Sequence, residues 1–355
     1  MRVMQLMAGG RHGGAETFFV DLVRALAGRG VAQLVVTRPF AERVTLLELS
    51  GAEVETAHYG GPLDLITGFR LQNAAARFAP DIALAWMNRA AAVMPRGAFV
   101  RVGRLGGYYD LKYYKRCDAL VCNTADIRDY VIAGGWRADR AFHIPNFSPV
   151  EDAAPAARAS LRTANDAKVV LLLARLERSK GIDTAIRALV DVPGAVLWIA
   201  GEGHEKQNLE RFAAGLGVDD RVRFLGWRGD RSALLRAADI CVVASRDEPF
   251  GNVVVNAWAH AVPLVATRAR GPGALVRDGE DGLLVPIDDP VAMAAAINRV
   301  IGDKAFAQGI VSKGSARAAG AFSEEAVVGQ YLDLFKALAA SRGRPADLPP
   351  GPAGA

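Results

Sequence analysis

The sequence predicts an α/β protein made of two tandem, Rossmann-like doubly wound domains that face a cleft. With 355 residues, the chain exceeds the ~250–300 residues at which a single hydrophobic core stops growing. Short, continuous apolar runs alternate with amphipathic helical stretches, which is typical of a parallel sheet covered by helices on both faces. This alternation stops near residue 150 and starts again near residue 167.

The first domain is predicted over residues 1–150. Its expected strands are "RVMQLM", "AQLVVT", "DIALAWM", "ALVCNT" and "AFHIPNF". A glycine-rich loop and the helical stretch "AETFFVDLVRALAGRG" follow the first of these strands. Residues 151–166 are rich in alanine and charged residues, and they predict the linker between the domains.

The second domain is predicted over residues 167–340. Its expected strands are "KVVLLLARL", "AVLWIAGEG", "RVRFLGW", "DICVVAS", "PLVAT" and "GLLVP", each separated from the next by a helical segment. The stretch "FSEEAVVGQYLDLFKALAA" predicts a last amphipathic helix. Residues 341–355 are rich in proline, glycine and alanine, which predicts a disordered tail.

The composition excludes several classes of protein. No run of about 18 apolar residues is present, so we expect no transmembrane helix. The apolar stretch at the start of the chain is too short for a secretory signal. Cys117, Cys122 and Cys241 form neither a paired framework nor a metal-binding spacing, which favours reduced thiols in a cytoplasmic protein.

Positive charge is concentrated in the first half of the chain. The formal net charge is +5, and residues 1–150 carry 18 Lys and Arg against 13 Asp and Glu. The densest segment is "RVGRLGGYYDLKYYKRC", in which tyrosines are interleaved with Arg101, Arg104, Lys112, Lys115 and Arg116. This pattern suits an anionic acceptor or an anionic membrane surface, and a solvated basic face is the alternative. No nucleic-acid motif accompanies it, so we expect no nucleic-acid partner.

Three polar stretches follow predicted strands, where the ligands of doubly wound sheets bind. In "GGRHGGAE", Gly13 and Gly14 would let the backbone approach a phosphate or sugar, and a plain tight turn is the alternative. In "ARLERSKG", Arg175 and Lys180 place two cations on one short loop. Such a pair suits a diphosphate, and a solvated charged loop is the alternative.

The third stretch is "SRDEPFGNVVVNAWAH". Glu248 precedes a predicted helix that starts at Gly251 and Asn252, and the first N–H groups of such a helix can bind an anion. Asn256 lies a little over one turn further, on the same face as Asn252. A salt bridge from Glu248 to a neighbouring arginine is the structural alternative.

The order of these motifs resembles family 4 of the retaining glycosyltransferases, which are nucleotide-sugar enzymes of the GT-B fold. The resemblance extends to about residue 340 and is strongest over residues 169–290. It is carried by "GGAE", "IPN", "ARLERSKG", "GEG", "VRFLGW", "AADICVVAS", "EPFGNVVVNAWA" and "GEDGLLVP", in that order. The segment "RLGGYYDLKYYKRCD" is similar to the lipopolysaccharide-core branch of the family.

The resemblance implies a role for each matching residue. Arg175 and Lys180 match the basic pair that binds the donor diphosphate and stabilises the departing nucleotide. Glu248 matches a Glu that contacts hydroxyl groups of the donor sugar. Asn256 stands where the family has a second Glu that binds the ribose, which is a departure. Gly14 matches the loop where the acceptor and the donor phosphate meet.

The function implied by the resemblance is retaining glycosyl transfer from a nucleotide-diphosphate sugar to a glycan or lipid-linked acceptor, in lipopolysaccharide core or cell-envelope polysaccharide synthesis. No Asp-x-Asp element stands where a metal-dependent transferase needs one, so we expect no metal and no cofactor. The last helix is expected to cross back to the first domain, and the enzyme to work in the cytoplasm, at the inner face of the membrane. A nucleotide-sugar 2-epimerase of the same fold and a non-catalytic sugar-nucleotide or glycan-binding relative are the alternatives.

Overall fold

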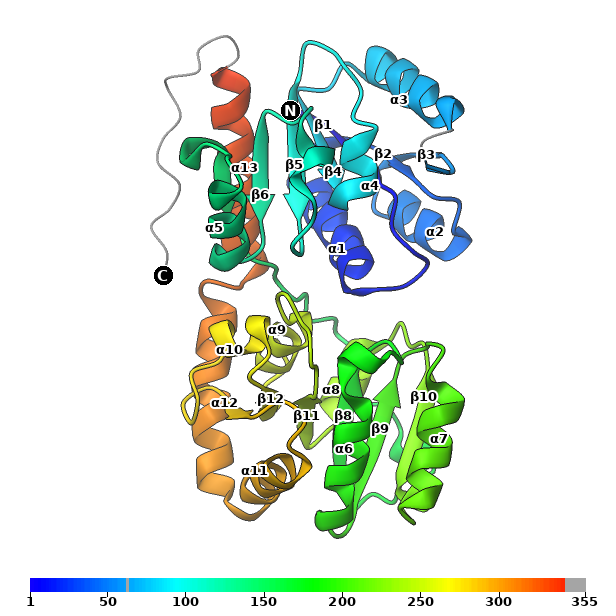
Figure 1. The fold of residues 1–355 in the computed structure, drawn as a ribbon, viewed down its shortest axis with the longest axis vertical. Coiled ribbons are helices and arrows are strands. Elements are labelled where there is room, and N and C mark those ends of the chain that lie inside the picture. The colour runs from blue at the N-terminus through cyan, green and yellow to red at the C-terminus, as the bar shows by residue number, and fades with distance from the viewer. Residues whose placement is uncertain (62–63, 342–355) are drawn as a thin grey trace. The chain divides into compact units, whose positions relative to one another are not determined.

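The computed structural model describes residues 1–61 and 64–341, which divide into two compact units (Figure 1). The first unit consists of residues 1–146 together with the last helix, α13 (Glu324–Ala340). The second unit is Phe147–Ser323. The chain therefore passes between the units twice, once after Asn146 and once after Ser323.

The described residues of the first unit form a seven-stranded parallel sheet in the order β3-β2-β1-β4-β5-β6-β7. The strands are β1 (Arg2–Met7), β2 (Ala32–Thr37), β3 (Glu53–Thr56), β4 (Ile82–Trp86), β5 (Val100–Leu105), β6 (Ala119–Cys122) and β7 (Ala141–His143). The helices are α1 (Gly14–Gly28), α2 (Ala41–Leu49), α3 (Leu65–Phe78), α4 (Met87–Ala92) and α5 (Ala125–Ala133), with the short 3-10 turns η1 (Leu111–Tyr114) and η2 (Ala138–Arg140).

Two strands of this sheet, β3 and β5, have no counterpart among the expected strands. Strand β3 is a four-residue edge strand whose sequence, EVET, has no continuous apolar run. Strand β5 reads VRVGRL, so two arginines and a glycine interrupt its apolar pattern. A search for continuous apolar runs misses both, because β3 is a partly exposed edge strand and the polar residues of β5 are covered by neighbouring elements rather than marked by local composition.

The second unit repeats the design with a six-stranded parallel sheet in the order β10-β9-β8-β11-β12-β13. The strands are β8 (Lys168–Leu173), β9 (Ala195–Ala200), β10 (Val222–Gly226), β11 (Ile240–Val243), β12 (Leu264–Thr267) and β13 (Leu283–Val285). The helices are α6 (Ile182–Ala188), α7 (Lys206–Gly215), α8 (Arg231–Ala237), α9 (Asn252–Ala259), α10 (Arg270–Leu275), α11 (Pro290–Gly302) and α12 (Lys304–Ala319). The 3-10 turns are η3 (Arg158–Leu161), η4 (Arg178–Lys180), η5 (Leu189–Asp191) and η6 (Asp219–Arg221).

Both sheets reverse their strand order beside the first strand, and this reversal locates the ligand site of each unit. In the first unit β1 lies between β2 and β4, and in the second unit β8 lies between β9 and β11. At such a switch point the loops that follow the two neighbouring strands diverge, which leaves a crevice outside their carboxyl ends. The expected fold class, two doubly wound units in tandem, is confirmed by these topologies.

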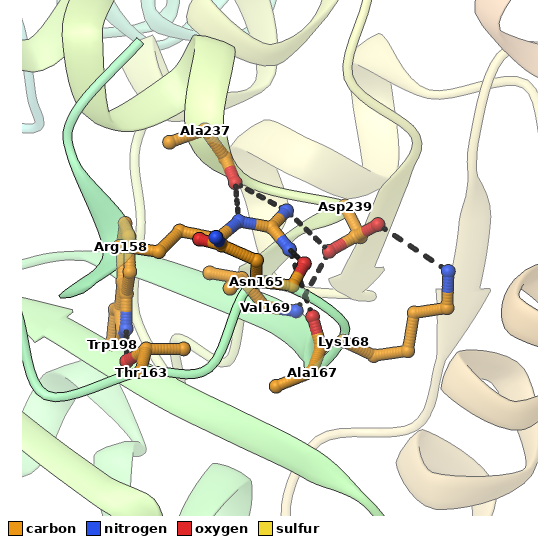
Figure 2. Close-up of polar contacts among 9 residues, drawn as sticks. All are labelled: Arg158, Thr163, Asn165, Ala167, Lys168, Val169, Trp198, Ala237 and Asp239. Atoms are coloured by element: carbon orange, nitrogen blue, oxygen red, sulfur yellow. Dashed lines mark hydrogen bonds and ion pairs between the residues drawn. The ribbon is translucent and has the colours of Figure 1, made fainter.

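The segment 151–166, expected to be a linker, is part of the second unit. Figure 2 shows Arg158 of this segment, whose guanidinium pairs with Asp239 at 2.8 Å and donates to three backbone carbonyls. Those carbonyls are of Asn165, Ala167 and Ala237. The indole of Trp198 also donates to Thr163 Oγ1, at 2.9 Å. Arg158 therefore docks the segment onto the second unit, because it bonds to Ala237 of α8 and to Asp239, which lies just before β11.

The last helix belongs to the first unit, where α13 packs against α1. Its residues Tyr331, Phe335 and Leu338 are buried, and Tyr331 accepts a hydrogen bond from Arg104 of β5 at 3.1 Å. Within the described residues no helix is both long and apolar enough to span a membrane. Apart from Ser341, the tail predicted at 341–355 lies outside the described residues.

Candidate active site

The candidate site of the second unit lies at its switch point, between the loops that follow β8 and β11. Arg175 follows β8 by two residues, and Lys180 ends the turn η4 on the same loop. Glu248 stands between β11 and α9. Since β8 and β11 are neighbours in the sheet, all three residues leave the same edge of it.

The loop after β8, residues 174–181, is fixed mainly by backbone contacts. Gly181 has a φ of +58°, and a Cβ atom there would lie 2.0 Å from the carbonyl oxygen of Ala244. At Gly201, after β9, a Cβ would lie 1.9 Å from the carbonyl oxygen of Ala174. Only glycine permits such approaches of one backbone to another. The charged side chains of the loop are therefore not needed to hold it in place.

Lys180 and Glu248 are in direct contact. The Lys180 ammonium donates to a carboxylate oxygen of Glu248 at 3.0 Å, and their side chains are only 13% and 22% exposed. Lys180 also lies 3.4 Å from the carbonyl oxygen of Asp247. A cation and a carboxylate held together at a switch point offer one group for a phosphate and the other for a hydroxyl.

Arg246 and Arg268, the two arginines considered as salt-bridge partners of Glu248, pair with other carboxylates. Arg246 makes a bidentate contact with Asp183, at 2.6 and 2.9 Å, and reaches Asp288 at 2.6 Å. Arg268 pairs with Asp278 at 2.6 Å. The structural alternative for Glu248, a salt bridge to an arginine, is thus not the arrangement found.

Arg246 braces the two site loops against each other. Its side chain donates to the carbonyl of Arg178, and its backbone N–H donates to the carbonyl of Ser179 at 2.8 Å. Burial alone would raise the pKa of Asp183, but hydrogen bonds and charge from Arg246 outweigh it and lower that pKa below its usual value. These contacts of Arg246 were not apparent from the sequence. The only signal was that "RSK" and "SRD", in the loops after β8 and β11, each contain an arginine.

Arg175 takes no part in the Lys180–Glu248 contact. Its guanidinium pairs with Glu177 at 2.5 Å, and its side chain is 51% exposed. Glu177 lies in the same short loop, two residues after Arg175. A ligand diphosphate would have to compete with this carboxylate for the guanidinium.

Helix α9 starts where the third motif predicts. Gly251, with a φ of +101°, precedes its first residue, Asn252. Asn256 is 9% exposed, and its side-chain amide makes no hydrogen bond within the described chain. Its backbone carbonyl accepts from His260 Nδ1 at 2.8 Å, while His260 Nε2 lies 2.9 Å from Ser232 Oγ. The donor and acceptor groups of the Asn256 amide are therefore not used by another protein group in the described part of the chain.

In the first unit, the glycine-rich loop of residues 8–13 precedes α1, which begins at Gly14. Here side chains hold the loop. Glu16 accepts from the Gly10 N–H at 2.8 Å and fills the space beside Gly9 and Gly13. Arg43 of α2 is buried and donates to the carbonyls of Gly10 and Arg11, the latter at 2.9 Å. Glu16 belongs to the "GGAE" motif, whereas nothing in the sequence singles out Arg43.

The basic segment after β4 does not form one surface patch. Arg104 is only 1% exposed, so its assignment to an acceptor or membrane patch is wrong. Its guanidinium lies over the rings of Phe18 and Trp86, at 4.8 and 4.4 Å, and donates to Tyr331 and Asn146. Two aromatic faces stabilise the buried cation.

The other four basic residues of the segment are at least partly exposed. Arg101 is occupied by a bidentate contact to Asp118, with atoms 2.6 and 3.0 Å apart. Lys112, Lys115 and Arg116 are exposed. The exposed part of the predicted patch therefore consists of Lys112, Lys115 and Arg116. Arg101 is partly exposed, but its charge is paired with that of Asp118.

Comparisons with known proteins identify the family. Residues 12–151 match a family model described as Glycosyltransferase Family 4, and residues 167–303 match one described as Glycosyl transferases group 1. The chain is 39% identical over 332 residues to the lipopolysaccharide core biosynthesis glycosyltransferase LpsE of Rhizobium meliloti (strain 1021), covering 92% of this chain and 96% of LpsE. The chain belongs to glycosyltransferase family 4. The predicted family and the predicted class of enzyme, a glycosyltransferase, are confirmed.

Other relatives also match this chain over nearly its whole length. LpsD of the same organism, also named a lipopolysaccharide core biosynthesis glycosyltransferase, is 39% identical and is covered completely. Anabaena HepE, solved in complex with UDP and glucose, superposes with a TM-score of 0.84 at 25% identity, covering 95% of the transferase and 99% of HepE. WaaG, a lipopolysaccharide glycosyltransferase, has a TM-score of 0.69 at 16% identity and covers 94% and 99% of the two chains, which shows the fold alone. The fold is GT-B.

Proposed function

We propose that this transferase moves a sugar from a nucleotide-diphosphate donor to a glycan or glycolipid acceptor, with retention at the anomeric carbon. The proposed pathway is lipopolysaccharide core or other cell-envelope polysaccharide synthesis. The observation that carries the proposal is the Lys180–Glu248 contact at the switch point of the second unit. The names of LpsE and LpsD support the pathway, and the UDP and glucose bound to HepE support the donor class.

The donor site can be derived from the pair. When a nucleotide sugar binds, Lys180 exchanges Glu248 for an oxygen of the diphosphate, and the freed carboxylate accepts hydrogen bonds from sugar hydroxyls. Arg175 turns from Glu177 to the same diphosphate. The start of α9, at Gly251 and Asn252, adds backbone N–H groups. As the glycosidic bond breaks, negative charge grows on the leaving diphosphate, and cations already in place stabilise it.

Asn256 is proposed to bind the ribose. An amide both donates and accepts, so it can satisfy one ribose hydroxyl, but it lacks the charge of the Glu that the family has there. Its freedom from partners within the described chain supports this role. The substitution predicts weaker discrimination for the nucleoside, rather than loss of the diphosphate contacts.

The reaction is proposed to need no metal ion, because two cations and a helix start supply the positive charge that a metal would provide. Within the described residues no group of three His, Cys, Asp or Glu side chains is arranged to hold a metal. Transfer should continue in excess EDTA. Abolition of transfer by EDTA and its recovery with Mg²⁺ would contradict this part of the proposal.

The acceptor is proposed to reach the enzyme at the inner face of the cytoplasmic membrane. The exposed Lys112, Lys115 and Arg116 of the first unit would favour an anionic surface. Replacing all three by Ala should reduce flotation with anionic liposomes. Flotation equal to that of the unchanged protein would remove these residues from membrane binding.

The test of the function is a transfer assay with the purified protein, UDP-, GDP- and ADP-sugars and core oligosaccharide acceptors. We expect a new glycoside with the anomeric configuration of the donor, and its loss in Lys180→Ala. An inverted product would refute retention. Accumulation of epimerised free sugar with no acceptor product would refute transfer and favour the epimerase alternative.

A further inference from the structure

The first unit contains a pocket away from its glycine-rich loop. The pocket has a volume of about 610 Å³, and four basic residues and one tryptophan make up more than half of its nine lining residues. Asp118, in its wall, directly precedes β6, and Arg140 directly precedes β7. The pocket is therefore at the amino edge of the sheet, opposite the carboxyl edge where a doubly wound sheet binds its reacting ligands.

Four cations line this pocket: Lys112, Lys115, Arg137 and Arg140. Three of them have carboxylate partners outside the lining: Lys112 pairs with Asp110 at 2.7 Å, while Arg137 and Arg140 share Asp139, at 2.6 and 4.0 Å. Lys115 pairs with no carboxylate in the described part of the chain. An ammonium without a partner beside further cations raises the local positive potential and favours an anion.

The one carboxylate in the lining is already neutralised. Asp118 accepts three hydrogen bonds from Arg101, two from the guanidinium and one from the backbone N–H, at 2.6 to 3.0 Å. This cation lies outside the lining, so Asp118 does not cancel the charge of the four basic residues. The net charge that faces the pocket stays positive.

The two segments that line the pocket, around η1 and after α5, pack closely against each other. Leu111 of η1 lies so close to Gly134 that a Cβ at residue 134 would be 2.3 Å from its Cδ1 atom. Trp136, half-buried, adds a flat apolar wall beside the cations. The volume exceeds what a bare phosphate needs and lies in the range of small-molecule sites. The combination suits a phosphate attached to a ring with an apolar face.

We propose that this pocket binds a phosphorylated sugar, with the phosphate on Lys115 and Arg137 and the sugar ring against Trp136. Only the choice of a sugar rests on the proposed function, because acceptors in envelope synthesis are glycans. The preference for phosphate rests on the pocket itself. The site holds the ligand away from the reacting edge, so it is a second site and takes no part in the chemistry.

The test is calorimetric titration of the full chain with glucose 6-phosphate, with glucose as the neutral control. Lys115→Ala and Arg137→Ala should each weaken binding by about tenfold, as expected for one charge-assisted hydrogen bond. Arg116→Ala is the matched control, because Arg116 is exposed and adjacent to Lys115 but does not line the pocket. Unchanged affinity in both pocket variants, or equal binding of glucose, would overturn the proposal.

Titration of Lys180→Ala with glucose 6-phosphate tests whether the ligand binds in this pocket or in the donor site. Binding of glucose 6-phosphate should survive Lys180→Ala, even if the same protein loses nucleotide binding or shows no transfer at all. Loss of glucose 6-phosphate binding in Lys180→Ala, with Lys115→Ala unaffected, would place the ligand in the donor site and overturn the pocket.

Competition with lipid vesicles distinguishes a soluble phosphorylated ligand from a phosphate carried by a lipid. If phosphatidic acid vesicles compete with glucose 6-phosphate and phosphatidylcholine vesicles do not, the pocket also accepts a phosphate displayed on a membrane. If neither competes, the ligand is a soluble sugar phosphate, as proposed. Vesicle binding without any binding of glucose 6-phosphate would overturn the proposal. The basic residues would then act only as a charged surface that attracts anionic lipid.

Discussion

The first turns of the two sheets occupy equivalent positions but are held by different means. In the first unit, the loop of residues 8–13 is fixed by charged side chains, Glu16 on one side and Arg43 on the other. In the second unit, the loop of residues 174–181 is fixed mainly by backbone packing at Gly181 and Gly201, and Arg246, from outside the loop, adds a hydrogen bond to the Arg178 carbonyl.

This difference in how the two loops are stabilised bears on which charged side chains are available to bind a ligand. A charged side chain that already satisfies backbone groups is not available to a ligand, because releasing it would leave those groups unpaired. In the second unit Lys180 makes a long contact to the Asp247 carbonyl, at 3.4 Å, and a shorter one to the Glu248 side chain, at 3.0 Å, which is the partner that we propose a ligand replaces. We therefore expect loss of a charged side chain to reduce stability in the first loop, and in the second loop to reduce binding while leaving stability nearly unchanged, whereas a change at Gly181 itself should reduce stability.

The largest effect is expected from Gly181→Ala. The new Cβ would clash with the Ala244 carbonyl and would also be forced to a positive φ, which together cost about 3 kcal/mol. Gly217→Ala is the matched control, since Gly217 has a φ of +67° and nothing within 4 Å of its Cβ position, so it should cost only about 1 kcal/mol. Urea unfolding measures both. Equal losses would mean that the loop is not held by this backbone contact.

A smaller effect is expected from Arg43→Met in the first loop. Methionine keeps much of the volume but leaves the carbonyls of Gly10 and Arg11 without their buried donor, which costs about 2 kcal/mol. The control is Arg29→Met, because Arg29 is exposed and should be neutral. Nucleotide binding should be unchanged in both variants. A variant that is stable but unable to bind nucleotide would show that the first loop has the role assigned to the second.

The smallest effect is expected from Asp183→Asn, which weakens the brace between the two site loops. The pKa of Asp183 is lowered in the folded state, so its ion pair with Arg246 stabilises the fold above the usual value of 3.8 and is lost as the pH falls through the lowered value. Because the Asp183 side chain is 43% exposed, the loss at neutral pH is only about 0.5 kcal/mol.

Unfolding of Asp183→Asn and the unchanged protein should be compared at pH 7 and at pH 3. The difference in stability is expected to shrink at the lower pH, where the carboxylate of the unchanged protein is being protonated. A difference that grows as the pH falls would have the wrong sign for this ion pair.

The sequence predicted the fold and the edge at which the site lies, because both follow from local patterns. Apolar runs mark buried strands, and polar motifs after them mark the carboxyl ends of those strands. Lys180 and Glu248 could be proposed as neighbours for this reason, although 68 positions separate them along the chain.

What the sequence missed depends on contacts between distant residues. Arg104 lies in a basic and aromatic segment that suggests a surface, yet Phe18, Trp86 and Tyr331 enclose it from other elements. Strand β5 was missed for the same reason, since its Arg104 and Gly103 are buried only by the elements around them. The pairing of Arg175 with Glu177 was missed because two charged residues in one loop are equally compatible with solvation.

The central claim is that Lys180 binds the donor diphosphate in exchange for Glu248. Calorimetric titration of Lys180→Ala with the nucleoside diphosphate that the unchanged protein prefers tests it most directly, with Arg178→Ala as the matched loss of charge from the same turn. The account predicts a loss of about tenfold to a hundredfold in affinity for Lys180→Ala and little change for Arg178→Ala. Equal affinities in the two variants would contradict it.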